Sequence, residues 1–242
     1  MKGKAWALFL LIFPILACDS KKVEQINVEV PQGVIVPEGM IYIPAGEFTM
    51  GHKDEPRTLL GVKIKSSAYF IDRYEVSRAQ YGAFNKQYIF DEKFGDFPAA
   101  YVTWDEAKAY CQAQGSQLPT EAQWEKSARG TDGRKWPWRI YVQHPNNGFS
   151  GFIPEKVAKR SEWISPYGVY GMGHNVWEWM RDTYTYKGQL AKDNNLFKTI
   201  RGGVTQTHIT IKFSPTYARN WMDPKSSFNF IGFRCVREIK KG

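Results

Sequence analysis

Alternation of hydrophobic and polar residues predicts short strands near both ends of the chain. The stretch "GMIYIPAGEFTMGH" alternates in two runs, residues 40–43 and 47–50, and the Pro-Ala-Gly between them predicts a β-hairpin. The stretch "AYFIDRYEVS" predicts a further strand over 68–77, and a run of β-branched residues predicts strand and loop over 200–220. The stretch "FIGFRCVREI" predicts a closing strand over 230–239.

Helical periodicity with N-terminal capping residues predicts helices in the first half of the chain. Ser77 is suited to cap a helix over 78–87. Thr103 is placed to cap a second helix, and Glu106 completes a capping box with it before Gly115 ends the helix. Three residues fall on one face of this helix and are expected to be buried: Ala107, Tyr110 and Cys111.

The stretch "LPTEAQWEKSARG" repeats the helical pattern. Thr120 caps, Gln123 stands at the third helical position, and Gly130 stops the helix. Residues 131–170 are irregular, aromatic and rich in turn residues. Few strands, few helices and long ordered loops predict an α+β domain.

Composition supports a loop-rich globular domain. Hydrophobic residues make up 43% of the 242 residues and charged residues 24%, which is ordinary for a globular protein. Aromatic residues make up 15%, and with 21 Gly and 13 Pro they favour loops held by aromatic packing over a helical bundle. The net charge of +9 is scattered, with a short cluster only at Arg237, Lys240 and Lys241. We therefore interpret it as a solvated basic surface and expect no nucleic-acid partner.

The N-terminus predicts export and membrane anchoring. The stretch "MKGKAWALFLLIFPILAC" has two lysines and then an apolar run too short for a typical membrane-spanning helix. Its last four residues resemble a bacterial lipobox, which implies cleavage before Cys18 and acylation of its thiol. The alternative is an ordinary secretory signal with an incidental cysteine. We expect a signal peptide over 1–17, a polar tether over 18–38, and a domain over 39–242 held at the membrane of the bacterial cell envelope through acylated Cys18.

Two further cysteines, Cys111 and Cys235, are compatible with this oxidising compartment. They make either one disulfide, closing a long loop, or two buried free thiols.

Six stretches together resemble the formylglycine-generating enzyme family, also called the sulfatase-modifying factor family. They are "MIYIPAGEFTMG", "FIDRYEVSRAQYGAFN", "YVTWDEAKAYCQAQGSQLPTEAQWEKSARG", "SPYGVYGMGHNVWEW", "IRGG" and "IGFRCV", and they span residues 40–236. The resemblance implies the family's variant of the C-type-lectin-like fold, with few regular elements and long ordered loops. It also implies a disulfide between Cys111 and Cys235, because a vertebrate member joins the cysteines at the matching positions.

The family's copper site is not carried over. Family enzymes oxidise a substrate cysteine with oxygen, using two cysteines that bind copper(I), a soft ion that prefers thiolates. The resemblance places these two positions at Thr207 and Lys212, and neither side chain is a suitable ligand. A single imidazole at His208 does not make a metal site. We therefore expect no copper and a domain that is not catalytic.

The resemblance also implies a calcium site at "NVWEW". Glu178 is present, and the carbonyls of His174 and Val176 are available as ligands. Gly171 stands where the family has an acidic or amide ligand, and His174 stands where it has Gly. Losing a side-chain ligand weakens the attraction for calcium, so we expect at most a weakened site.

Three hypotheses for function follow from a chain that keeps the stretches typical of the family but lacks its copper-binding cysteine pair. The first is an envelope lipoprotein that binds a protein or glycan ligand through the segment 204–230. The second is an oxidoreductase acting on sulfatase cysteines by an altered site, and the third is a scaffold subunit of an envelope machine. The residues expected to bind the ligand are Thr205, Gln206, His208, Lys212, Tyr217, Arg219, Asn220 and Trp221.

Overall fold

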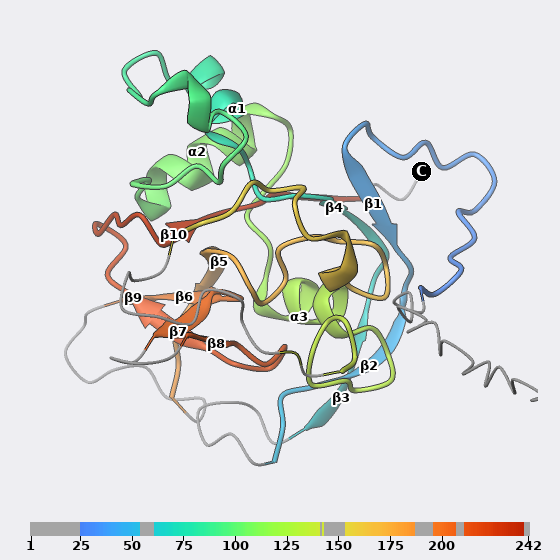
Figure 1. The fold of residues 1–242 in the computed structure, drawn as a ribbon. Coiled ribbons are helices and arrows are strands. Elements are labelled where there is room, and N and C mark those ends of the chain that lie inside the picture. Colours follow the sequence, from blue (N-terminus) through green and yellow to red (C-terminus); the bar gives the residue numbers. More distant parts are fainter. Residues whose placement is uncertain are drawn as a thin grey trace, which may run out of the picture.

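Four small sheets and three α-helices make up the part of the chain that the structure describes. The computed structural model describes residues 25–53, 61–140, 142, 153–186, 196–206 and 211–239, without the side chains of Gln206 and Ile211. Within these residues no helix has the length and apolar character needed to cross a bilayer. Strands from distant parts of the sequence lie side by side in each of the two larger sheets (Figure 1).

The larger sheets are assembled from both halves of the chain. The first has the antiparallel order β1-β4-β11, with strands Met40–Ile43, Tyr69–Asp72 and Val236–Glu238. The second has the order β10-β5-β6-β9, with strands Ile231–Gly232, Trp177–Thr183, Lys198–Arg201 and Asn220–Met222. In this sheet β10 runs parallel to β5, whereas the other pairs are antiparallel. The C-terminal segment therefore contributes an edge strand to each sheet.

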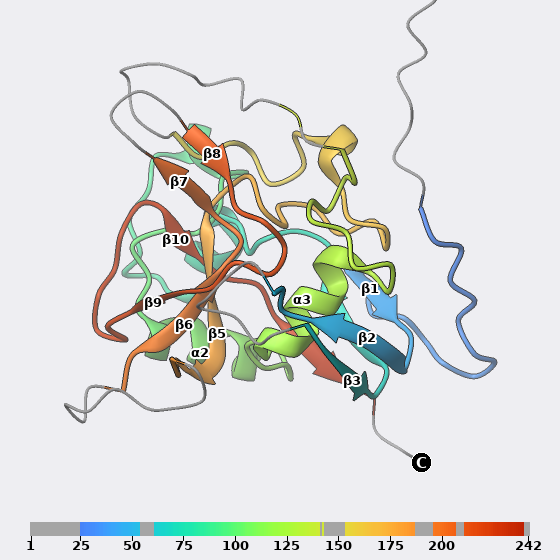
Figure 2. The ribbon, with the colours of Figure 1, turned by 90° about the horizontal axis from the view of Figure 1, so that it is seen from below.

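Two antiparallel ribbons complete the strand structure. One joins β2 (Gly46–Met50) to β3 (Val62–Ser66). The other joins β7 (Val204–Gln206) to β8 (Ile211–Phe213). The helix α3 packs between β2 on one side and β5 and β6 on the other, near the centre of both views (Figures 1 and 2).

The predicted hairpin over 40–50 is wrong in its pairing, although both strands exist. β1 pairs with β4, and β2 pairs with β3, so the chain changes sheets between them. The connection is held by a side chain, because Lys126 Nζ donates to the carbonyls of Pro44 at 2.6 Å and Gly46 at 3.3 Å. Pro44 has no N–H to close a turn, which removes one hydrogen bond that a hairpin would use.

The predicted closing strand over 230–239 is also wrong as a single strand. β10 and β11 belong to different sheets, and the residues between them cross the core. Phe233, Arg234 and Cys235 are all buried in succession, at 0%, 0% and 2% exposure. A strand with one solvated face would alternate between buried and exposed positions, so three buried residues in a row mark a crossing segment.

The helix predictions are confirmed at their N-termini. Ser77, Thr103 and Thr120 each cap the following helix, and all three caps form a capping box. The helices are α1 (Arg78–Phe84), α2 (Trp104–Ala113) and α3 (Glu121–Arg129), with short 3₁₀ turns at Glu92–Phe94 and Ser161–Trp163. The first helix is shorter than predicted. On α2 the three residues expected to be buried, Ala107, Tyr110 and Cys111, are buried.

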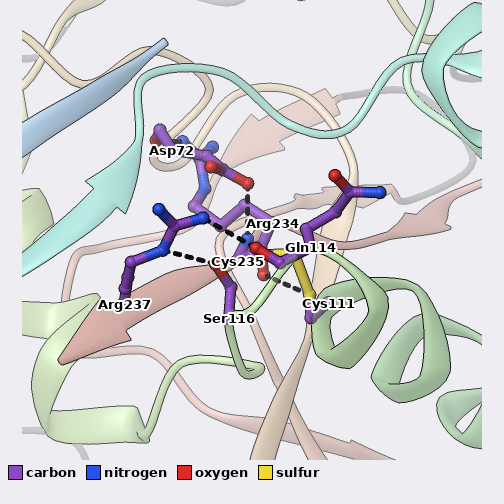
Figure 3. The surroundings of a disulfide bond; sticks show 7 residues. All are labelled: Asp72, Cys111, Gln114, Ser116, Arg234, Cys235 and Arg237. Carbon is purple, nitrogen blue, oxygen red and sulfur yellow. Dashed lines mark hydrogen bonds between the residues drawn. A yellow bond between two sulfur atoms is a disulfide. The ribbon is translucent and has the colours of Figure 1, made fainter. Parts of the chain in front are cut away.

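A disulfide joins Cys111 on α2 to Cys235, which settles the alternative between a disulfide and free thiols. The two Cα atoms are 5.6 Å apart, and 124 positions separate the cysteines in sequence. Asp72 Oδ2 accepts a hydrogen bond from the Cys235 N–H at 2.7 Å (Figure 3). Because the closed loop spans half the chain, the disulfide stabilises the fold by about 5 kcal/mol in the chain-entropy model.

Residues 25–38, which we expected to be tether, pack against the domain. The Ile26 N–H donates to the Pro166 carbonyl at 2.8 Å. Val28, Val34 and Val36 pack against a buried cluster whose members are Met40, Tyr42 and Phe70. The folded unit therefore begins earlier than residue 39, because these valines gain apolar burial that a free tether would not provide.

Candidate functional site

The β7–β8 ribbon and β9 carry the segment that we expected to bind a ligand. Thr205 on β7 stands directly opposite Lys212 on β8, and both side chains are exposed. On β9, Asn220 is half-buried and Trp221 is 45% exposed, with its ring 4.5 Å from that of Phe197. His208 and the side chain of Gln206 lie outside the described residues. The structure thus leaves Thr205, Lys212 and Trp221 exposed and Asn220 half-buried, on the β7–β8 ribbon and on β9.

The expectation that Tyr217 and Arg219 are exposed is wrong. The Tyr217 ring is 5% exposed and stacks on the His52 ring with the centroids 4.6 Å apart. Arg219 is 8% exposed and holds Glu121 with two hydrogen bonds of 2.5 and 2.6 Å. Burial opposes the charge of Arg219, but the bonds and charge of Glu121 outweigh it and place the pKa of Arg219 above its ordinary value. Burial therefore keeps both side chains from contacting a ligand at the surface.

The position matched to the second catalytic cysteine holds an ammonium group in solvent. Lys212 lies on the exposed side of β8, and Thr207, the other matched position, lies outside the described residues. The two cysteines of the domain are bonded to each other, so neither supplies a thiolate. Among the described residues no group of three or more His, Cys, Asp or Glu side chains is arranged to hold a metal ion. The donor set does not fit copper(I), which needs thiolate ligands.

The charged residues of the "LPTEAQWEKSAR" helix are buried and structural. Arg201 Nη1 lies 3.0 Å from Glu121 Oε2, and its Nη2 lies 2.6 Å from Glu125 Oε2. Arg129 Nη1 donates to the other oxygen of Glu125 at 2.7 Å, and all of these side chains are at most 8% exposed. Buried charges persist only when paired, so this network fixes α3 against the sheet. Sequence reasoning missed the network, although Glu121 and Glu125 at i and i+4 beside Trp124 were its available signal.

The side chain of Glu178 is engaged by Arg234. Arg234 Nε and Nη2 donate to the two Glu178 oxygens at 2.6 and 2.8 Å, and the Trp124 indole N–H donates to one of them at 3.0 Å. Both members of the ion pair are fully buried. Burial opposes the charge of Arg234, but Glu178 outweighs it, so the pKa of Arg234 lies above its ordinary value.

A second carboxylate, Glu75, fills the space beside Gly171. A Cβ added at Gly171 would lie 2.3 Å from Glu75 Oε1, so this carboxylate occupies the place of a side chain at 171. No described group donates a hydrogen bond to either Glu75 oxygen, and its nearest cation is Arg234 Nη2 at 3.9 Å. Burial raises the pKa of Glu75 to about 7, against the lowering effect of Arg234.

These contacts do not fit the calcium site that the sequence allowed. Calcium takes six to eight oxygen ligands, and a guanidinium already holds both oxygens of Glu178. His174 and Val176 are buried, and Gly171 has no side chain to offer. Instead, the Arg234 guanidinium supplies the positive charge beside the carboxylates of Glu178 and Glu75. Sequence reasoning missed Glu75 because nothing in the local sequence shows that its carboxylate reaches Gly171.

Comparison with known proteins identifies relatives across most of the chain. The family model of the sulfatase-modifying factor enzyme 1-like domain matches residues 28–239. The chain is 27% identical over 281 residues to the formylglycine-generating enzyme of Bos taurus, covering 84% of this chain and 75% of that protein. It is 32% identical over 159 residues to the Bos taurus protein named inactive C-alpha-formylglycine-generating enzyme 2, covering 58% of this chain and 50% of that protein.

A longer bacterial relative shares the same region. The Bacillus subtilis (strain 168) protein YfmG is 26% identical over 268 residues, which is 84% of this chain but 55% of the relative's length. Among solved structures, PvdO from Pseudomonas aeruginosa aligns with a TM-score of 0.66 at 22% identity, covering 88% of this chain and 100% of PvdO. At this identity the likeness shows the fold, and it confirms the predicted α+β fold of the formylglycine-generating enzyme type.

Proposed function

This chain belongs to the sulfatase-modifying factor enzyme 1-like family, and we propose that it is a non-catalytic member that uses the fold to bind a ligand or partner. One observation carries the proposal. The positions matched to the copper-binding cysteine pair hold Thr207 and Lys212, while the remaining domain cysteines are consumed in the Cys111–Cys235 disulfide. Without a thiolate pair the chain has no ligand set for copper(I).

The binding face is the exposed surface of the β7–β8 ribbon and β9. Trp221 supplies an aromatic contact, Lys212 a cation, and Thr205 and Asn220 supply hydrogen-bonding groups. Aromatic side chains are enriched at the centre of protein interfaces, and polar side chains commonly surround them. Similarity to the Bos taurus protein named inactive C-alpha-formylglycine-generating enzyme 2 supports a non-catalytic use of the fold. A protein or a glycan is the ligand class that such a surface suits.

The proposal includes a lipid anchor in the bacterial cell envelope. The apolar run before Cys18 and the lipobox-like "ILAC" support cleavage at this cysteine and acylation of its thiol. Several acyl chains on one residue give stable anchoring where a single chain does not. Metabolic labelling with an alkyne fatty acid tests this point, with Cys18→Ser as the matched control. Label in the wild type that is lost in Cys18→Ser is expected, and equal label in both proteins would refute the anchor.

A peptide oxidation assay tests the absence of catalysis. The full chain in detergent is incubated with a Cys-x-Pro-x-Arg peptide, copper and oxygen, and mass spectrometry reports conversion of the thiol to an aldehyde. The same peptide with Ser for Cys is the matched substrate control, and the bovine formylglycine-generating enzyme is the positive control. No aldehyde is expected from the wild type. Turnover would overturn the proposal and require a metal site that includes Thr207 or His208.

A further inference from the structure

A broad groove runs between α2 and β11, on a part of the surface that the proposed function does not use. Its volume is about 980 Å³. The side chains that define its chemistry are Trp104, Lys108, Gln112, Gln117, Arg181 and Arg237. Its floor includes the buried apolar residues Leu118 and Val236. In Figure 1, α2 lies away from the β7–β8 ribbon. The β9 end of the proposed binding face lies closer to the groove, because Lys198 contacts the Trp104 ring and pairs with Met222 on β9.

One wall of the groove is a row of side chains along α2. Trp104, Lys108 and Gln112 stand at i, i+4 and i+8, so they follow one another on one face over roughly 12 Å of helix. The Trp104 indole N–H donates to the Met180 carbonyl at 2.8 Å, which fixes the plane of the ring. Lys108 Nζ lies 5.0 Å and Lys198 Nζ 4.1 Å from the ring centroid, so two ammonium groups accompany a fixed aromatic surface.

The opposite wall carries guanidinium groups from β5 and β11. Arg237 is held by the Ser116 hydroxyl at 3.4 Å and the Gln114 carbonyl at 2.7 Å, as Figure 3 shows. Arg181 donates to Gln117 Oε1 and keeps a side chain that is 41% exposed. Among the described residues its neighbour Glu238, at 3.8 Å and 61% exposed, is the one carboxylate that lines the groove. The described lining of the groove therefore holds three cations, Lys108, Arg181 and Arg237, and one carboxylate.

We propose that this groove binds an acidic glycan, a saccharide chain that bears carboxylates or sulfates. Trp104 is half-buried and has two ammonium groups over its ring, so only the part of the ring that stays exposed offers apolar contact to a sugar. The cations of the groove offer charge-assisted hydrogen bonds to acidic substituents. The glutamine amides of residues 112 and 117 are exposed and both donate and accept, which suits hydroxyl groups. Cleavage before Cys18 would remove Lys2 and Lys4 from the net charge of +9, and the remaining +7 (9 − 2) draws the same ligands towards the surface.

The same residues argue against a lipid surface as the occupant. Membrane-binding surfaces bury exposed apolar side chains among the acyl chains, in addition to their basic residues. None of the exposed large hydrophobic side chains of the described residues lines this groove. A single-stranded nucleic acid would also stack on a tryptophan between cations, so it is included below as a competing probe.

Isothermal titration of the full chain in detergent tests the inference. The probes are tetragalacturonate and a sulfated tetrasaccharide, with neutral maltotetraose as the control. Binding of at least one acidic probe is expected, with weaker or no binding of maltotetraose and a loss of affinity as salt is raised. No binding of either acidic probe, or equal binding of the neutral one, would overturn the proposal. Tighter binding of a thymidine oligonucleotide or of phosphatidylglycerol vesicles would overturn it as well.

Matched variants locate the binding. Lys108→Gln with Arg181→Gln removes two exposed groove cations and is expected to weaken acidic-probe binding roughly tenfold. Lys63→Gln with Lys65→Gln removes the same charge from β3, distant from α2 in Figure 1, and is expected to leave binding unchanged. Equal losses in both pairs would show that net charge, and not the groove, attracts the probe. Because all four positions are exposed, we expect both double variants to fold as the wild type does. Failure here leaves the peptide oxidation result unaffected, so the two proposals are tested separately.

Discussion

Replacing Glu75 by glutamine isolates the energetic effect of the carboxylate that lies beside Gly171. Glutamine keeps the size of the side chain but cannot ionise. In the folded protein burial raises the pKa of Glu75 from 4.5 to about 7. The unfolded chain therefore releases this proton near pH 4.5, whereas the folded chain keeps it until about pH 7. Between these values the folded state binds more protons, so the free energy of unfolding falls as pH rises.

The size of the effect follows from the difference between the two pKa values. At about 1.4 kcal/mol per pH unit, the raised pKa corresponds to roughly 3 kcal/mol of stability that is present below pH 4.5 and lost above pH 7. Arg234 Nη2, at 3.9 Å from Glu75, is too far away to donate a hydrogen bond that would offset this loss. We expect Glu75→Gln to unfold with similar free energy to the wild type at pH 5 and to be more stable by up to about 3 kcal/mol at pH 8.

Urea unfolding at pH 5, 6, 7 and 8 measures this difference with the disulfide intact. Asp72, whose pKa burial raises to about 6, titrates in both proteins, so its effect cancels in the comparison. Glu29→Gln changes an exposed glutamate in the same way and serves as the matched control. A Glu75→Gln protein that is less stable than the wild type at pH 8 would refute the reasoning. That result would mean that Glu75 is ionised when folded and that its charge stabilises the fold through Arg234.

Three further predictions concern the disulfide, the binding face and calcium. The double variant Cys111→Ala and Cys235→Ala should lose about 5 kcal/mol of unfolding free energy, measured by denaturant unfolding, and a loss below about 1 kcal/mol would contradict the loop-closure argument. Arg219→Ala should lower the free energy of unfolding by roughly 3 kcal/mol, with a clear fall in melting temperature, because it breaks a buried ion pair. Trp221→Ala, at an exposed position, should change the melting temperature little, and equal falls in melting temperature for the two variants would contradict this reasoning. Calcium and a chelator should leave the melting temperature equal within error, since Arg234 already engages Glu178, and a calcium-dependent rise would restore the metal-site interpretation.

Local features of the fold were predictable from sequence, whereas pairings across the chain were not. The caps at Thr103 and Thr120 are satisfied within three residues, so the short motif contains all the partners that it needs. The pairing of β1 with β4 depends on a strand far along the chain, and the alternating pattern fits that pairing as well as a hairpin. The sequence therefore predicted that the strands exist, but it did not predict which strands pair in each sheet.

The candidate site was also predictable only in part from the sequence. The absence of the cysteine pair is a property of the sequence itself, and it needed no coordinates. The burial of Arg219 was not visible, because arginine in a loop is usually exposed and its partner Glu121 stands 98 positions away. Glu75 was missed for a related reason, since the space that it fills belongs to Gly171 on another segment. Buried polar networks are the part of this fold that composition and periodicity do not report.

The docking of residues 25–38 on the domain limits how far the protein can stand from a bilayer. If Cys18 carries the proposed acyl chains, only the residues up to Ile26 separate the lipid from the first backbone bond to the domain. A fully extended chain of this length spans at most about 30 Å, which is less than the roughly 40 Å width of a domain of this size. The domain then cannot turn end over end above the membrane. The end that bears Pro166 would be held nearest the lipid, and the opposite end would face away from the membrane.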